Sequence, residues 1–184
     1  MTTTAPRSAR VMALHPASQC FGWVVFEGPF APHDWGVTYA TGDKNASCLQ
    51  KVEAMLARFQ PDTLILETFE RRLSSRSDRI ARLGRAISAL AADRGVDVAI
   101  YTRQDIRACF RSVGARSRQE IAEAVVRHID ALRPHLPSKR KSWNGEDYRM
   151  TLFSAAALAL THYQLGANTL FDDLSQSLDV DKDQ

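Results

Sequence analysis

The change of hydrophobic period along the chain is the feature that most constrains its fold. Three short runs typical of β-strands come first, at 11–14, 21–26 and 33–40. Apolar residues at helical spacing then fill 49–59, and a continuous apolar run follows at 63–66. Strands joined by short turns pair antiparallel, whereas a strand that follows a helix usually joins its sheet in parallel. The pattern therefore predicts a mixed sheet.

The second half of the sequence continues with helices and one more strand. Helical spacing covers 78–93, 103–112, 117–132 and 147–163, and a strand pattern covers 96–101. The expected order is β-β-β-α-β-α-β-α-α-α. It predicts an α/β fold with a mixed five-stranded sheet, three antiparallel strands followed by two parallel ones, flanked by helices. Ribonuclease H-like domains are built in this order.

Length and composition predict one folded domain between two polar ends. The chain has 184 residues and is 45% apolar, which is enough for one core. We expect a flexible leader at 1–9, a domain at 10–164 and an acidic, mobile tail at 165–184. No apolar run is long enough to span a membrane, and the start lacks a secretion signal. Three widely separated cysteines favour a reducing, cytoplasmic location.

Charge is segregated along the sequence. The net charge is +3, but the last fourteen residues hold five Asp and one Lys. The remainder is therefore strongly basic, and a basic body favours an anionic partner such as nucleic acid.

A candidate site lies where the first and fourth strands end. The first strand ends at His15 and the fourth at Glu67. Ligands of open α/β sheets bind beyond the carboxyl ends of the strands, so we expect these two side chains to meet there. Hydrolysis of nucleic acid at such a site uses divalent metals held by carboxylates.

Several short motifs then occur in a shared order, from Val11 to Tyr163, and they resemble RuvC-type Holliday junction resolvases of the ribonuclease H-like superfamily. The motifs are Leu14-His15-Pro16-Ala17-Ser18, Phe21-Gly22-Trp23, Pro61-Asp62 before a strand ending in Glu67, Leu83-Gly84-Arg85-Ala86, Tyr101 before a basic segment, Gly114-Ala115-Arg116-Ser117-Arg118-Gln119, and the last helix from Ser154 to His162. The resemblance implies a structure-selective DNA endonuclease of recombination, dependent on Mg²⁺ or Mn²⁺. It also implies branched DNA as partner and a homodimer.

The acidic quartet that the resemblance implies is mostly missing. Its positions fall on His15, Glu67, Thr151 and Ser154, so one carboxylate is retained. Neutral hydroxyl groups are poor substitutes for carboxylates beside a dication. Two functions therefore stay open: an endonuclease with an atypical site, or a catalytically inactive module that binds nucleic acid or supports assembly.

One alternative set of ligands would keep the site active. Asp147 lies seven residues before Ser154, about two helical turns away on the same face. His15, Glu67 and Asp147 together would hold one softer metal such as Mn²⁺ or Zn²⁺. The endonuclease hypothesis therefore assigns Glu67, His15, Asp147, Ser154 and Thr151 to catalysis.

Three runs of basic residues flank the elements that border this site. Arginine forks suit phosphate oxygens, and such contacts position a nucleic acid backbone without reading its sequence. The predicted phosphate contacts are Arg71, Arg72, Arg76, Arg79, Arg103, Arg107, Arg111, Arg116, Arg118, Lys139, Arg140 and Lys141.

Overall fold

The computed structural model describes residues 9–68, 75–139 and 147–179, and of 75–77 and 165–179 only the backbone. Its sheet has five strands in the spatial order β3-β2-β1-β4-β5. Their bounds are β1 Val11–Pro16, β2 Cys20–Phe26, β3 Pro32–Tyr39, β4 Thr63–Glu67 and β5 Asp97–Tyr101. β1 pairs antiparallel with β2 and parallel with β4, and β4 pairs parallel with β5. The predicted mixed sheet is confirmed.

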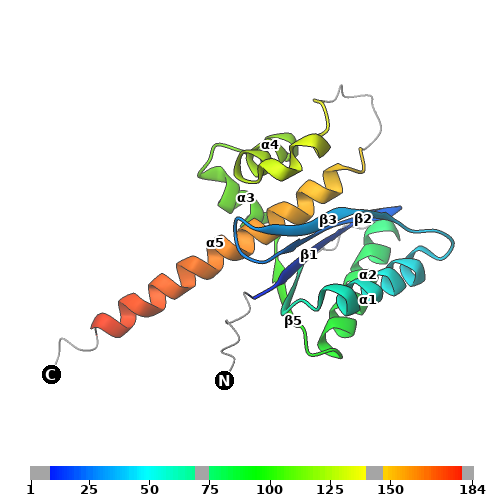
Figure 1. Ribbon diagram of the computed structural model, residues 1–184, viewed down its shortest axis with the longest axis horizontal. Coiled ribbons are helices and arrows are strands. Elements are labelled where there is room, and N and C mark those ends of the chain that lie inside the picture. Colours follow the sequence, from blue (N-terminus) through cyan, green and yellow to red (C-terminus); the bar gives the residue numbers. More distant parts are fainter. Residues whose placement is uncertain (1–8, 69–74, 140–146, 180–184) are drawn as a thin grey trace, which may run out of the picture.

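Helices cover both faces of this sheet (Figure 1). The helices are α1 Lys44–Phe59, α2 Ser75–Ala92, α3 Arg103–Arg111, α4 Arg118–His128 and α5 Met150–Asp179, and a 3₁₀ helix spans Asp130–His135. On one face α1 and α2 bury the side chains of a core that includes Met12, Leu14 and Leu64. On the other, α3, α4 and α5 pack over Ala13 and Ile65. Successive side chains of a strand point to opposite faces of the sheet, so the strands contribute to both cores.

The helix expected at 117–132 is shorter than its apolar pattern. It ends at His128, because Ile129 adopts a non-helical backbone (φ −128°, ψ 87°). A 3₁₀ segment that contains Pro134 follows. Proline lacks the amide hydrogen that an α-helix needs. Ile129 and Leu132 are buried at the same spacing as the apolar residues of α4. The apolar pattern of the sequence therefore continues past the point where the α-helix ends.

The last helix differs from its expected bounds at both ends. It begins at Met150 rather than at Asp147, because Tyr148 and Arg149 form a turn that precedes it. It then continues to Asp179, through backbone that composition assigned to the acidic tail. Figure 1 shows this C-terminal part extending away from the sheet. The mobility of the tail stays a prediction.

Two simple expectations about the chain agree with the structure. Cys20, Cys48 and Cys109 are all free thiols. Within the described ranges, no helix combines the length and apolar character that a membrane crossing requires.

Candidate functional site

His15 and Glu67 meet at the ends of two adjacent parallel strands, as the sequence predicted. The His15 Nδ1 and Glu67 Oε2 atoms lie 3.2 Å apart, and each side chain is 14% exposed. Burial by itself would raise the pKa of Glu67, but the contact with His15 and the positive charges of His15, Arg103 and Arg118 together hold that pKa below its ordinary value. Glu67 is therefore ionised at neutral pH and faces cations.

The first turn of α5 lies directly on β2 beside this pair. Gly22 is the register partner of His15. A Cβ atom on Gly22 would lie 2.1 Å from the carbonyl carbon and oxygen of Thr151. Only a glycine lets the helix backbone approach the strand this closely. The glycine of the Phe21-Gly22-Trp23 motif thus brings the start of α5 to the end of β1.

The hydroxyls of Thr151 and Ser154, at two predicted ligand positions, donate to backbone carbonyl oxygens one turn earlier. Thr151 is fully buried, and its Oγ1 donates to the Tyr148 carbonyl oxygen at 2.5 Å. The Ser154 Oγ donates to the Met150 carbonyl oxygen at 3.0 Å. A hydroxyl that donates its proton in this way leaves lone pairs to accept from another donor.

An arginine from α4 supplies that donor to Ser154. The Arg118 Nη2 atom donates to the Ser154 Oγ at 3.2 Å. The charge of the same guanidinium group lowers the pKa of Glu67. Arg118 therefore faces two of the positions at which the resemblance predicts metal ligands.

Asp147, the third ligand of the alternative metal site, is bound by Arg149. The Arg149 Nη2 atom lies 2.7 Å from Asp147 Oδ2, and Arg149 Nε and its backbone N–H also donate to this carboxylate. In the parts of the chain that the structure describes, no three His, Cys, Asp or Glu side chains gather as a metal site would need. The structure brings His15 and Glu67 together but does not add Asp147 to them.

Among the described residues, the donor set at the strand ends does not fit a pair of divalent cations. It offers one carboxylate, one imidazole and two hydroxyls, and arginine charges act on that carboxylate. Two dications need several anionic oxygens to offset their charge. Guanidinium groups at the same place repel a metal ion.

The predicted basic residues differ in their surroundings. Five exposed arginines lie on α3, just before α4 or at its first residue: Arg103, Arg107, Arg111, Arg116 and Arg118. Of these, Arg103 and Arg118 act on the charge of Glu67. Arg79 instead holds the fold together, because it donates to Asn45 Oδ1 at 2.7 Å and to the carbonyl oxygens of Ala17 and Ser18 at 3.0 Å. Its guanidinium thus binds the β1–β2 turn. The pattern of charges in the sequence did not predict this structural role.

Lys139 lies 3.8 Å from Glu123 and is 79% exposed. The other predicted contacts lie outside the described residues or have undescribed side chains: Arg71, Arg72, Arg76, Arg140 and Lys141.

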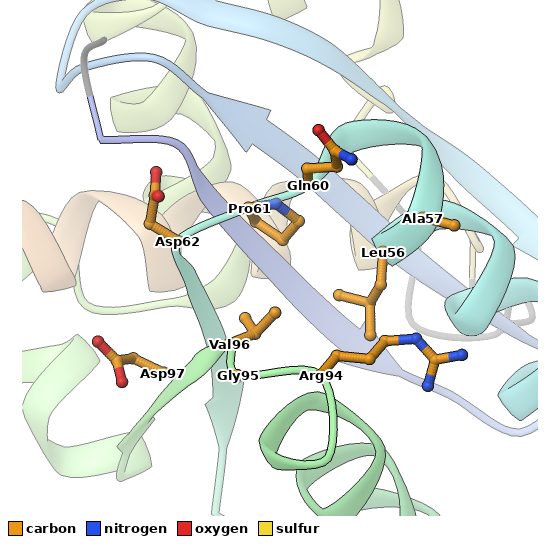
Figure 2. A pocket seen from close by; sticks show the side chains of 9 residues that line it. All are labelled: Leu56, Ala57, Gln60, Pro61, Asp62, Arg94, Gly95, Val96 and Asp97. Carbon is orange, nitrogen blue, oxygen red and sulfur yellow. The ribbon is translucent and has the colours of Figure 1, made fainter. Parts of the chain in front are cut away.

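A pocket lined by described residues lies away from this site. It encloses about 490 Å³ at the opposite end of β4, where Pro61 and Asp62 precede the strand. Figure 2 shows Arg94 and the carboxylates of Asp62 and Asp97 around it. Asp62 accepts from the Arg10 backbone, and Arg94 pairs with Glu53. These charges stabilise the loops there and do not extend the site at Glu67.

Comparison with solved structures then decides the fold. Thermus thermophilus RuvC in complex with a Holliday junction substrate matches with a TM-score of 0.62 at 20% identity, covering 83% of this chain and 91% of RuvC. The chain has the fold of RuvC-type resolvases. The yeast mitochondrial Holliday junction resolvase Ydc2 matches with a TM-score of 0.59 at 13% identity over 95% of this chain and 88% of Ydc2.

The fowlpox virus resolvase, solved with Holliday junction DNA, shares the RuvC-type fold with a TM-score of 0.51 at 13% identity, over 84% of this chain and 98% of its own. No protein-family model and no curated protein matches the sequence.

Sequence analysis missed how this RuvC-type fold fills the space beside Glu67. Arg118 was predicted as a phosphate contact and Ser154 as a lost ligand, yet their hydrogen bond was not foreseen. A second missed contact joins Tyr101 at the end of β5 to His162 on α5, with the Tyr101 Oη and His162 Nδ1 atoms 2.9 Å apart. Both contacts join residues far apart in sequence, and neither leaves a local signal.

Proposed function

We propose that this protein binds branched DNA at the strand ends of its RuvC-type fold and that it does so without metal-dependent cleavage. The observation that carries the proposal is the hydrogen bond from Arg118 to Ser154 beside the ionised Glu67. A guanidinium group here favours a phosphate oxygen over a metal ion.

The choice of branched DNA as ligand is supported by what the solved relatives bind. Thermus thermophilus RuvC and the fowlpox virus resolvase were each solved with Holliday junction DNA. The exposed arginines of α3 and α4 offer contacts to phosphates, which position a backbone by its shape. A protein that recognises the shape of the DNA backbone in this way distinguishes a junction from a plain duplex.

A divergent endonuclease is the second candidate. The pairing of His15 with Glu67 favours it, because an imidazole and a carboxylate are both metal ligands. The remaining oxygen ligands of the metal would then have to come from the DNA or from water. In this case Mg²⁺ or Mn²⁺ would be required for activity.

Junction binding and cleavage, measured on the same samples, separate the two candidates. We expect a labelled four-way junction to bind more tightly than a duplex of equal length, with an affinity that falls steeply between about 50 and about 200 mM salt. Denaturing gels should show no cut strand with millimolar Mg²⁺ or Mn²⁺. Metal-dependent cleavage that disappears in Glu67→Gln would favour the endonuclease, and equal affinity for duplex and junction would contradict branched-DNA binding. The homodimer and the cytoplasmic location stay predictions.

A further inference from the structure

Two arginines near Glu67 occupy equivalent positions in two successive helices. α3 begins with Thr102-Arg103-Gln104-Asp105, and α4 begins with Ser117-Arg118-Gln119-Glu120. In each helix the hydroxyl residue caps the helix, and the carboxylate three positions later accepts a hydrogen bond from the backbone N–H of the cap residue. Such a reciprocal box fixes the direction of the first turn. Arg103 and Arg118 are both the first residue after the cap.

The two arginines belong to different helices but lie near the same strand ends. Glu67 is the register partner of Tyr101, and Arg103 follows Tyr101 by two residues. Arg118 is held by its hydrogen bond to Ser154, in the first turns of α5. Both charges lower the pKa of Glu67.

The capping side chains already form hydrogen bonds with the backbone of their helices. The groups that remain to contact a ligand here are therefore the side chains of Arg103 and Arg118. The Thr102 hydroxyl accepts from the Asp105 backbone at 3.1 Å, and the Ser117 hydroxyl accepts from the Glu120 backbone at 3.2 Å. Glu120 also accepts from the backbone N–H groups of Arg116 and Ser117. Arg103 and Arg118 are exposed.

We propose that Arg103 and Arg118 form a metal-independent site for one phosphodiester group of the DNA, with Glu67 and Ser154 as positioning residues. This inference rests on the proposed function and names the site within it. The carboxylate of Glu67 attracts the two guanidinium groups. Their positive charges take the place of the metal ions that the resemblance predicts at this site. Each guanidinium carries its N–H donors in a planar fork that matches the oxygens of a phosphate group.

The test compares junction affinity in EDTA and in Mg²⁺ for the full chain and for matched variants, by fluorescence anisotropy. Wild-type affinity should differ by less than about twofold between the two buffers, since no metal contributes. Arg103→Gln and Arg118→Gln should each weaken binding about tenfold in EDTA, as loss of a charged hydrogen bond implies. Arg127→Gln removes an exposed arginine farther along α4 and should change affinity by less than about twofold.

Two further variants test the positioning role. Arg118→Lys keeps the charge but loses the fork, and it should recover only part of the affinity. Glu67→Gln should weaken binding in wild type and should cost less in the Arg118→Gln background, because one of the two guanidinium groups that Glu67 positions is then already absent. A purely structural role of Glu67 would give additive losses. Thermal melts verify that each variant is folded.

The outcomes distinguish this inference from the function on which it rests. Failure of the wild type to bind the junction would overturn both. Junction binding that needs Mg²⁺, or that Arg103→Gln and Arg118→Gln weaken no more than Arg127→Gln does, would overturn this inference alone and leave branched-DNA binding in place.

Discussion

At the scale of single residues, Gly22 and Glu67 determine what the strand ends can do. Gly22 permits the backbone of α5 to lie on β2. The charges of Arg103 and Arg118 act on Glu67. Gly22 and Glu67 both lie in short motifs that are visible in the sequence. Their effects depend on residues far away in the sequence, which explains why sequence reasoning located the site but not its contacts.

Replacement of Gly22 by alanine should destabilise the protein. The new methyl group would lie 2.1 Å from the Thr151 backbone, which cannot move as a flexible side chain would. We expect a loss of at least about 2 kcal/mol in the free energy of unfolding, measured by urea denaturation. Gly84→Ala is the matched control: it lies in α2 with no atom within 4 Å of its added Cβ, so it should stabilise by about 0.5–1 kcal/mol. Equal effects of the two changes would contradict the close packing of α5.

The depressed pKa of Glu67 predicts how stability depends on pH. A carboxylate whose pKa is lower in the folded state stabilises the fold above its unfolded pKa of about 4.3, and this contribution is lost as the pH falls through the folded pKa. Glu67→Gln should therefore be less stable than wild type at pH 7. The difference should shrink as the pH falls below about 4, in chemical denaturation at a series of pH values. A difference that stays constant with pH would contradict an ionised Glu67 among cations.

At the scale of elements, hydrophobic period predicted the strands and most helices, because each buries one regular face. It predicted α4 too long at its C-terminal end, because Ile129 and Leu132 remain buried after the α-helix has ended. It also ended the last helix too early, because the acidic charges masked backbone that is still helical. The two matched caps of α3 and α4 were readable as Ser/Thr-x-x-Asp/Glu but were not recognised as a pair.

The caps should contribute both stability and affinity. Thr102→Ala and Ser117→Ala each remove a side-chain acceptor of a helix N-terminus, and each should cost about 1 kcal/mol of unfolding free energy. Each should also weaken junction binding, because the adjacent arginine loses its fixed direction. Ser138→Ala, an exposed change outside any helix, serves as control in the same thermal and anisotropy measurements. Stability loss with unchanged affinity would separate the caps from the DNA site.

At the scale of the whole molecule, we propose that a RuvC-type fold carries a cationic site in the place where the resemblance predicts an anionic, metal-binding one. The order of strands and helices predicted the fold, since few topologies accept that order. The change of the site was predicted in part, from the lost carboxylates at His15, Thr151 and Ser154. What replaced them was not, because the guanidinium of Arg118 reaches Ser154 from another helix.

A crystal structure of the protein with a four-way junction, grown in Mn²⁺ and measured at the manganese absorption edge, tests this account most directly. We predict a DNA phosphate whose oxygens accept hydrogen bonds from Arg103 and Arg118, and no anomalous peak within coordination distance of Glu67. A manganese ion bound to Glu67 and to the DNA, with both arginines turned away, would contradict it.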